Sequence, residues 1–359
     1  MPRSDGAKER PRAGGRVPSL REVAREAGIS VTTASRALDR ERLHVVAGDT
    51  RRRVEAAAER LGYRPNPLAR GLRALRMETI AVVVHDIADP YFAEIVRGVT
   101  DASRDRYLTM VCSSDRDPAI ELRYVDLLID HRVAALLFAG GGLEDRAYQR
   151  AMRLRVARIR AYGGAIVALG PRVERWPAEV TDNRGGARLA TEHLIALGHR
   201  RIALVNGPPN VHTSAERAEG HLMAMGAAGL ETVAAEEEAF RTPAGATAAA
   251  RLLLRRVPFT GLFVASDTMA IGVVAELRRR GVRVPEDVSV VGFGDIPGWE
   301  FRHPPLTTVR SHLAAIGAAG VRRALAQLAG RGRSPRVHVH PVELVVRGST
   351  APAEAAVAP

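Results

Sequence analysis

The residues of this sequence best suited to specific recognition stand at 30–36, SVTTASR, where hydroxyl side chains surround a single guanidinium. Arg36 can donate two parallel hydrogen bonds to a guanine, and Ser or Thr hydroxyls can hold phosphate groups. Val31 and the small side chains beside it would let the protein backbone approach the DNA closely. These residue types predict contact with duplex DNA, provided that the stretch forms an exposed helix.

The helices that would position this stretch are marked by capping residues. Ser19 with Glu22 is a capping-box pattern that opens a first helix, Gly28 ends it, and Ser30 can cap a second helix over 31–38. The first helix has one apolar face, formed by Leu20, Val23, Ala24 and Ala27. Two short helices joined by a tight turn predict a helix-turn-helix, whose second helix can enter a major groove. An ordinary helical hairpin is the alternative on these residues alone.

Two further segments complete the N-terminal region. A third helix is predicted at 50–61, TRRRVEAAAERL, because its apolar residues face one side and Gly62 ends it. Residues 64–76 are basic, carry two prolines and include Gly71, so they form a weak helix in isolation. This segment is either a linker or a part of the chain that folds when it binds DNA.

The basic charge is concentrated near the N-terminus. The 359 residues carry a formal charge of +13, and residues 1–76 hold 18 Arg and Lys against 9 Asp and Glu. This concentration predicts a polyanionic partner for that region. Residues 1–17 have no apolar run, so we expect a disordered basic arm and neither a signal peptide nor a membrane anchor. The single cysteine, Cys112, excludes an internal disulfide and suits the cytoplasm.

A second group of polar residues follows predicted strands. These strands lie at 80–84, 108–112, 134–138 and 165–169, and again at 201–205, 261–265 and 288–291, with helices between them. Repeated strand–helix units predict parallel sheets covered on both faces, and the two sets predict two similar lobes. Ligands of such sheets bind beyond the carboxyl ends of the strands. A cleft there would be lined from its two sides by Asp86, Asp89, Tyr91, Phe92, Thr213, Ser214 and Arg217.

Several motifs stand in order along residues 18–347: SLREVAREAGISVTTASRAL, TRRRVEAAAERLGYRPNPLARGLR, DPYFAEIVRGV, DNRGGARLATEHLIALGHRRIALVNGP, ASDTMAIG and VPEDVSVVGF followed by PPLTTVR. In order and spacing they resemble the lactose-repressor (LacI/GalR) family of bacterial transcription regulators. The resemblance implies an all-α helix-turn-helix headpiece plus an α/β, two-lobed, periplasmic-binding-protein-like effector domain with two parallel doubly wound sheets. It also implies a cytoplasmic, nucleoid-associated homodimer that binds a palindromic operator in double-stranded DNA.

The resemblance also implies DNA contacts. Val31, Thr32 and Arg36 resemble base-reading residues, and the hydroxyl residues around them resemble phosphate or positioning contacts. Residues 66–73 resemble the hinge helix, with Leu72 as a wedge in the minor groove; packing within the hinge is the alternative for Leu72. The expected DNA-binding residues are Ser19, Leu20, Ser30, Val31, Thr32, Thr33, Ser35, Arg36, Asn66, Ala69, Arg70 and Leu72. Ala47 departs from the family because a capping Ser is common there.

For the cleft, the resemblance implies a small-molecule effector, a sugar or related metabolite. Arg217 matches the pocket arginine of the family, and Gly294 stands where many relatives carry an Asp that grips the ligand. Losing that carboxylate argues against assuming a simple sugar. The expected effector-binding residues are Asp86, Asp89, Tyr91, Phe92, Thr213, Arg217, Ser266, Asp267 and Gly294.

The expected division of the chain follows from these assignments. It runs as a basic arm at 1–17, a DNA-binding domain at 18–63, a hinge at 64–78, an N-terminal effector lobe at 79–180 and 310–338, a C-terminal effector lobe at 181–309 and 339–348, and a disordered tail at 349–359. The tail has no leucine heptads, so nothing indicates a tetramer-forming coiled coil and a dimer is expected.

Two other classes of protein are alternatives to a transcription regulator. A cytosolic sugar- or solute-binding protein of the same architecture is the alternative, and the basic headpiece argues against it. An enzyme is not expected, because Cys112 has no histidine tied to it by spacing. His338 and His340 alternate on a predicted strand near Glu343, but two histidines without further ligands indicate zinc only weakly, and solvent-facing polar residues are the simpler interpretation. No metal, cofactor or catalytic site is predicted, and we expect a transcriptional repressor.

Overall fold

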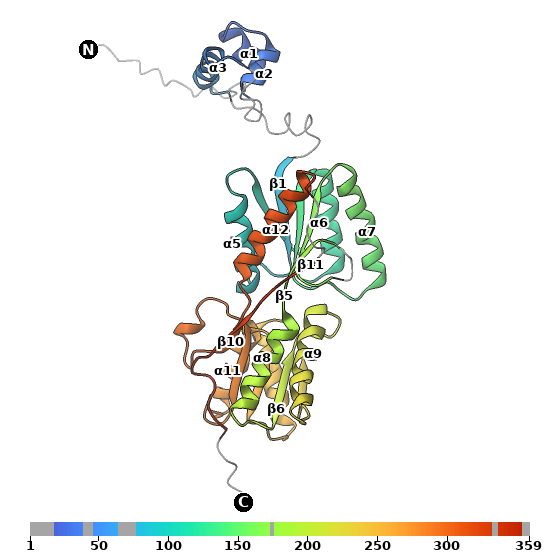
Figure 1. The fold of residues 1–359 in the computed structure, drawn as a ribbon, viewed down its shortest axis with the longest axis vertical. Helices are drawn as coiled ribbons and strands as arrows, with labels where there is room; N and C mark the ends of the chain where they lie inside the picture. The colour runs from blue at the N-terminus through green and yellow to red at the C-terminus, as the bar shows by residue number, and fades with distance from the viewer. Residues whose placement is uncertain (1–17, 39–45, 64–76, 173–175, 332–336, 354–359) are drawn as a thin grey trace, which may run out of the picture. The chain divides into compact units, whose positions relative to one another are not determined.

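The structure, a computed structural model, describes residues 18–38, 46–63, 77–172, 176–331 and 337–353 (Figure 1). The chain divides into two units, Met1–Ala74 and Leu75–Pro359. The first unit is called the headpiece below and the second the core. The predicted basic arm at 1–17 lies outside the described residues.

Within its described residues the headpiece holds three helices, α1 (Leu20–Glu26), α2 (Val31–Ala37) and α3 (Gly48–Leu61). The predicted capping box is confirmed: Ser19 Oγ accepts from the Glu22 amide while the Glu22 carboxylate accepts from the Ser19 amide at 2.6 Å. The turn after α1 contains Gly28 at φ +64°, a left-handed conformation that favours glycine. The helices share a core of small side chains: Val23, Ala24, Ala27, Ala34, Ala37, Val54, Ala57 and Ala58. The pattern of caps and apolar residues is therefore sufficient to specify a helix-turn-helix.

The third helix differs from its prediction at the start. It begins at Gly48, two residues before the predicted start at 50, and its N-cap Ala47 makes no side-chain capping bond. Ala47 has no oxygen that could accept from the first-turn amides, so this helix begins without the stabilisation that a serine would supply. Residues 39–45, which precede it, lie outside the described residues.

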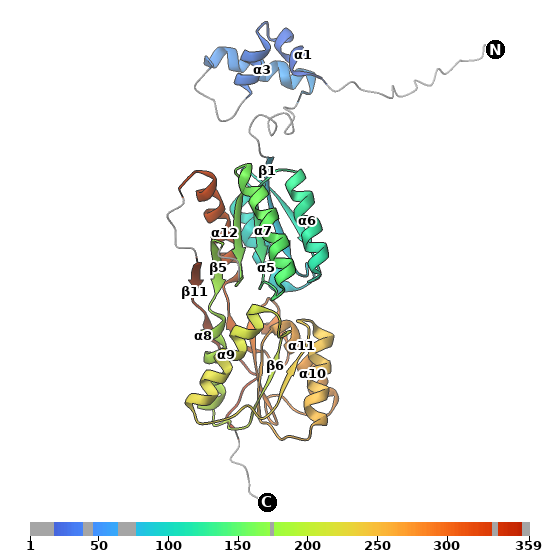
Figure 2. The ribbon, with the colours of Figure 1, turned by 90° about the vertical axis from the view of Figure 1, so that its right-hand side faces the viewer.

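The N-terminal lobe of the core is a parallel sheet in the order β11-β5-β4-β3-β1-β2. Its strands are β1 (Met77–Val84), β2 (Leu108–Ser113), β3 (Val133–Ala139), β4 (Ala165–Leu169), β5 (Ala178–Thr181) and β11 (Val337–His340). One face is covered by α5 (Pro90–Ser103) and α12 (Leu313–Leu328), and the other by α6 (Pro118–Asp130) and α7 (Arg146–Ala161) (Figures 1 and 2). Because both faces are buried, β3 is apolar throughout, and β1 is apolar from Ile80 to its end at Val84, without alternation.

The C-terminal lobe repeats this plan with the strand order β12-β10-β9-β8-β6-β7. Its strands are β6 (Ile202–Asn206), β7 (Ala235–Glu237), β8 (Gly261–Val264), β9 (Ser289–Gly294), β10 (Thr307–Arg310) and β12 (Glu343–Val345), of which β12 is antiparallel. The covering helices are α8 (Asn183–Ala196) and α9 (His212–Ala227) on one face, and α10 (Thr242–Leu254) and α11 (Asp267–Arg279) on the other. A short 3-10 helix, η1 (Trp299–Phe301), follows β9. The predicted fold class is confirmed, with one antiparallel edge strand added.

The chain passes between the lobes three times, after β5, after β10 and after β11. The predicted lobe boundary at 338/339 is therefore too early, because β11 continues to His340 within the N-terminal sheet. The predicted hinge at 64–78 is too long at its end, because β1 begins at Met77. Residues 64–76 lie outside the described residues.

The predicted disordered tail is wrong for residues 349–353. Ser349 is fully buried, donates to the Val290 carbonyl at 2.6 Å and accepts from the Thr307 amide at 2.8 Å. The Ala353 amide donates to the Leu197 carbonyl at 2.8 Å. The segment is rich in Ala and Pro and has no periodic apolar pattern, but backbone groups of the C-terminal lobe use it as a hydrogen-bonding partner. None of the helices in the described ranges is long and apolar enough to span a membrane.

Candidate DNA-reading face and effector cavity

The exposed side of α2 carries the residues predicted to read bases. Val31 is 42% exposed, Thr32 and Arg36 are also exposed, and Ala34 and Ala37 on the opposite side are buried in the headpiece core. Thr32 and Arg36 are four residues apart and so share one side of the helix. The structure thus places the three predicted base-reading residues on one accessible surface, called the reading face below.

The hydroxyl residues around the reading face are partly occupied in capping. Ser30 Oγ accepts from the Thr33 amide at 3.0 Å and lies 2.8 Å from the Thr33 hydroxyl, while Thr33 and Ser35 are half-buried. Leu20 packs against the headpiece core. The predicted hinge contacts lie outside the described residues, namely Asn66, Ala69, Arg70 and Leu72.

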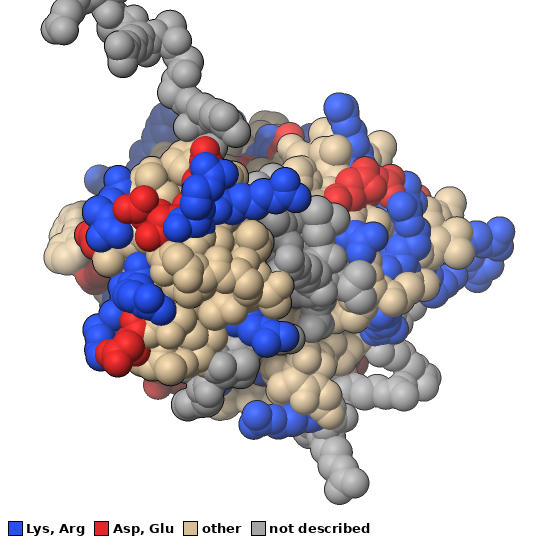
Figure 3. All heavy atoms as spheres, turned by 90° about the horizontal axis from the view of Figure 1, so that it is seen from above, with Lys and Arg blue, Asp and Glu red and all other residues tan. Residues whose placement is uncertain are grey.

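The folded headpiece itself is only slightly basic. Its described residues contain seven arginines and five acidic residues, so most of the positive excess of residues 1–76 is contributed by segments outside them. Figure 3, which draws side chains of both units, shows Lys and Arg scattered over the visible surface with Asp and Glu among them. The reading face therefore depends more on Arg36 than on a broad field from the folded headpiece.

The core contains a cavity between its two lobes, called the effector cavity below. The N-terminal lobe contributes His85, Asp89, Tyr91, Phe92, Arg116, Gly140 and Gly141, and the C-terminal lobe contributes Val211, Thr213, Arg217, Phe240 and Ser266. These residues follow the carboxyl ends of strands or begin the next helices, where the sheet topology predicts a ligand site. The cavity has a volume of about 30 Å³, enough for about one or two water molecules.

Arg217 projects from α9 into the wall of this cavity. Its side chain is 3% exposed, its Nε donates to Asn183 Oδ1 at 3.0 Å, and another guanidinium nitrogen donates to the Ala265 carbonyl. The guanidinium lies 3.8 Å from the ring centre of Phe293, and Tyr91 of the N-terminal lobe lines the same cavity. Burial lowers the pKa of Arg217 from its ordinary value. The side chain is thus held rigidly in a cavity that both lobes line.

Arg116 supplies a second guanidinium, from the turn after β2. Asp115 and Arg116 both have positive φ values, 51° and 61°, a conformation that costs free energy in residues other than glycine. The Arg116 guanidinium lies 5.0 Å from the ring centre of Phe240 and makes no hydrogen bond to the part of the chain that the structure describes. Burial lowers its pKa to about 10, so it stays charged at neutral pH. The strained turn therefore presents a charged donor group to the cavity.

His85 and Asp89 provide the other titratable groups of the cavity. Burial, with the charges of Arg116 and Arg172, lowers the pKa of His85 well below its ordinary value, so the ring is neutral. Its Nδ1 has no hydrogen-bond partner among the described residues. Burial raises the pKa of Asp89, although hydrogen bonds from Thr268 and the Tyr91 amide oppose this shift. The cavity thus combines two guanidinium groups with one carboxyl group.

Contacts across the cleft hold the two lobes together. Thr268 Oγ1 on α11 donates to Asp89 Oδ1 at 2.8 Å in a buried position. Arg241 pairs with Asp115 and lies 3.7 Å from Asp86. A β-bridge also joins residues 143 and 211. The lobes are therefore closed on the cavity, which accounts for its small volume.

Outside these contacts lies a wider groove of about 470 Å³. Its polar lining includes Asp86, Asp89, Ser113, Asp115, Arg241 and Thr268. Asp86 belongs to this outer groove and not to the wall of the effector cavity, where the sequence had placed it. The groove and the cavity share Asp89, so the groove is a candidate entry route.

Two other predicted effector residues lie apart from the cavity lining. Asp267 is fully buried, with its Oδ1 accepting from Thr308 Oγ1 at 2.6 Å and its Oδ2 from the Ile296 amide at 3.1 Å. Gly294, at φ +138°, packs beside it. Burial raises the pKa of Asp267 to about 6. Asp267 thus joins α11 to the C-terminal sheet, and it does so beneath the cavity wall formed by Ser266.

Sequence reasoning missed His85, Arg116 and Phe240. Arg116 stands directly after a correctly predicted strand, so the rule that ligands bind at carboxyl strand ends could have found it. Phe240 follows β7, a strand of three residues that gives no clear apolar period. The turn conformation that directs Arg116 into the cavity has no sequence signal.

The fold and these two sites define a class of protein: a helix-turn-helix DNA-binding headpiece joined to a two-lobed core that encloses a small-molecule cavity. Residues 19–66 match the bacterial regulatory proteins of the lacI family, and residues 191–350 match a periplasmic binding protein-like domain. The chain is 32% identical over 337 residues to the HTH-type transcriptional repressor CytR of Escherichia coli strain K12, covering 92% of this chain and 96% of CytR.

Solved structures agree with this assignment. The Lac repressor dimer bound to operator and the anti-inducer ONPF has a TM-score of 0.82 at 26% identity, covering 94% of this chain and all of that chain. The transcriptional regulator CelR in complex with cellobiose has a TM-score of 0.67 at 30% identity, covering 92% of this chain and 99% of that chain. The chain belongs to the LacI family of DNA-binding transcriptional regulators, as the sequence motifs predicted, and its relatives are regulators and not enzymes.

Proposed function

We propose that this chain is a cytoplasmic repressor that binds a palindromic operator as a homodimer and is controlled by a small molecule in the effector cavity. The observation that carries the proposal is the cavity itself: both lobes line it, so a ligand there acts on the angle between them. The similarity to the Lac repressor dimer bound to operator supports the dimer and the operator.

DNA recognition is assigned to the reading face. Arg36 would pair with guanine, which contributes roughly 1–3 kcal/mol of discrimination against another base, while Val31 and Thr32 contact neighbouring base edges. The hydroxyls of Ser19, Ser30, Thr33 and Ser35 would hold phosphates and fix the register. Leu72 is proposed as the minor-groove wedge of the hinge, as the family resemblance implies.

Control is proposed to work through an equilibrium between open and closed lobes. A ligand shifts that equilibrium only if it binds one state more tightly, and typical coupling free energies are about 1–3 kcal/mol. The Thr268–Asp89 hydrogen bond and the Arg241–Asp115 pair each join the two lobes, so opening of the lobes would break them. In the dimer, closure would move the N-terminal lobes relative to each other and decide whether the two hinges can fold on the operator.

The side chains that line the cavity indicate which chemical class of effector it would bind. Arg116 and Arg217 offer donors, whereas Asp89 is the one carboxylate among the lining residues that the structure describes. Both hydrogen bonds to Asp89 from those residues go to Oδ1, which leaves Oδ2 for a ligand hydroxyl. A sugar or related metabolite rich in oxygen acceptors fits this balance. The cellobiose complex of CelR supports a sugar-sized ligand in this fold.

The proposal is tested by selecting bound fragments from genomic DNA with the purified full-length chain, at moderate salt, with and without a metabolite library. Enrichment of one palindrome, and its change when a single metabolite is added, is the expected result. Equal binding to all fragments under every condition would refute the repressor. Tight metabolite binding without any sequence preference would instead identify a solute-binding protein of the same architecture.

A further inference from the structure

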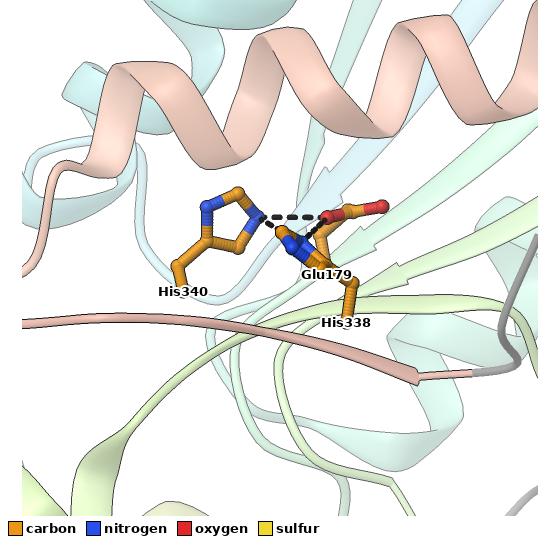
Figure 4. Close-up of side chains that lie close together, drawn as sticks. All are labelled: Glu179, His338 and His340. Carbon is orange, nitrogen blue, oxygen red and sulfur yellow. Dashed lines mark hydrogen bonds and ion pairs between the residues drawn. The ribbon is translucent and has the colours of Figure 1, made fainter.

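The strands β5 and β11 bring together three side chains that are far apart in the sequence. The two strands are parallel neighbours, and His338 is paired in register with Glu179. His340 follows two residues later and so projects from the same face of the sheet. Figure 4 shows one carboxylate oxygen of Glu179 joined by dashed lines to both imidazole rings, with a helix above the three side chains in this view. This set of three residues is called the Glu–His–His cluster below.

Three potential ligand atoms converge in this cluster. Glu179 Oε2 lies 2.9 Å from His338 Nδ1 and 2.7 Å from His340 Nε2, and the two nitrogens are 3.3 Å apart. A point about 2.1 Å from all three, the usual distance of Zn²⁺ from nitrogen or oxygen, lies only about 1 Å outside their plane. Donors of a tetrahedral ion stand about 3.4 Å apart, so movements of a few tenths of an ångström would complete the site.

Hydrogen bonds within the cluster alone leave an unfavourable arrangement of donors and acceptors. If both imidazoles donate to Glu179 Oε2, their two N–H groups face each other at 3.3 Å; if one ring instead accepts from the other, its nitrogen lone pair faces the carboxylate oxygen. A cation placed among them would instead accept a lone pair from each atom. Neutral imidazole and carboxylate are ligands that late first-row divalent metals accept, and two histidines with one glutamate form a known zinc ligand set.

The surroundings also suit a metal. The Glu179 side chain is 5% exposed, and its other oxygen, Oε1, accepts from Arg323 of α12, which fixes the carboxylate orientation as outer contacts do in metal sites. The His340 side chain is 13% exposed and that of His338 is 54% exposed. The exposed side gives an ion access and leaves room for water as a further ligand.

We propose that Glu179, His338 and His340 form a binding site for a divalent transition metal of the Zn²⁺ type, with water completing its coordination. This site is separate from the effector cavity and does not depend on the proposed function. The exposed His338 agrees with the sequence interpretation of solvent-facing histidines, and Glu179 adds a potential third ligand that the sequence did not indicate. Both strands lead directly into connections between the lobes, so the metal would fasten two of those connections to each other.

The test is calorimetric titration of the full chain, purified without a histidine tag, with Zn²⁺. We expect one Zn²⁺ per chain, and no comparable binding of Mg²⁺, which does not favour imidazole. His338→Gln and His340→Gln each keep a donor for Glu179 but lose the imidazole ligand. Since outer contacts alone are worth 10–100-fold in metal affinity, each variant should weaken Zn²⁺ binding by about 100-fold or more.

His303→Ala is the matched control, because His303 is exposed on the loop before β10 of the C-terminal lobe, whereas the cluster lies on the N-terminal sheet. Its Zn²⁺ affinity should equal that of the parent chain. Circular dichroism and thermal unfolding without metal check that the variants fold, and Glu179→Gln serves as a third variant if a histidine variant does not. The proposal is overturned if the parent chain binds no Zn²⁺, or if the folded cluster variants bind it as tightly as the His303 control.

Discussion

The reading face and the effector cavity differ in the number of elements that form them and in the burial of their side chains. The reading face stands on one seven-residue helix, its side chains are exposed, and its shape is set by a cap and a turn within a few residues. The effector cavity takes side chains from both lobes, buries them, and depends on contacts such as Thr268–Asp89 that join residues 179 positions apart. A substitution in the reading face should change only which DNA sequence is bound. A substitution in the effector cavity should change effector binding, lobe closure and the stability of the core together.

Arg217→Ala should produce the largest effect. It removes a buried guanidinium and leaves the Ala265 carbonyl and Asn183 Oδ1 without their donor, which costs about 2–4 kcal/mol of core stability. The response of operator binding to the effector should disappear, while operator binding itself remains, since the headpiece is a separate unit. Fluorescence anisotropy with labelled operator, read with thermal unfolding, measures both. A normal response would show that the effector binds somewhere other than this cavity.

Arg36→Ala should have a large but purely local effect. The loss of a bidentate contact should relax base preference at one position of each half-site by roughly 1–3 kcal/mol. The free energy of unfolding should change by less than about 0.5 kcal/mol, because the side chain is exposed. Selection from a random DNA pool measures the preference. Arg53→Ala, also exposed but on α3, is the control, and an identical selected sequence for Arg36→Ala and the parent chain would remove Arg36 from base reading.

Thr268→Val should have a moderate effect confined to the core. It keeps the side-chain volume but removes the 2.8 Å hydrogen bond to Asp89, a bond to a carboxylate worth about 1.5–3 kcal/mol. Part of that free energy stabilises the closed state relative to the open state. The effector concentration at half-response should therefore rise by about tenfold. Thr247→Val, exposed on α10, should leave it unchanged. If both variants responded alike, the hydrogen bond would have no part in closure.

The smallest effect should come from the pH dependence of Asp267. Its pKa is raised to about 6 in the folded chain against about 4 when unfolded, so the folded state binds the extra proton. The stability contributed by this group is fully present below pH 4 and is lost as the pH rises through 6. Relative to Asp267→Asn, the parent chain should therefore lose about 1 kcal/mol between pH 5 and pH 7. Urea unfolding at both pH values measures this difference, and parallel curves would contradict the buried position.

The helix-turn-helix, the long strands and the family were readable from the sequence. Ser19, Glu22 and Gly28 act within four residues of their partners, so capping and turn chemistry determine α1 and α2 locally. Strand β3 and the Ile80–Val84 part of β1 are marked by continuous apolar residues. Sequence motifs in a fixed order then identified the family without any coordinates.

Features that depend on contacts between residues far apart in the sequence were decided only by the tertiary structure. The short strands β5 and β7 have too few residues for a clear period, and they are held by neighbours in the sheets. Only the register of β5 with β11 brings Glu179 to the histidines 159 and 161 positions later. Likewise, only the packing of the C-terminal lobe orders Ser349. Local free-energy preferences are encoded within a few residues, but a site made by two strands or two lobes exists only after the chain has closed long loops around it.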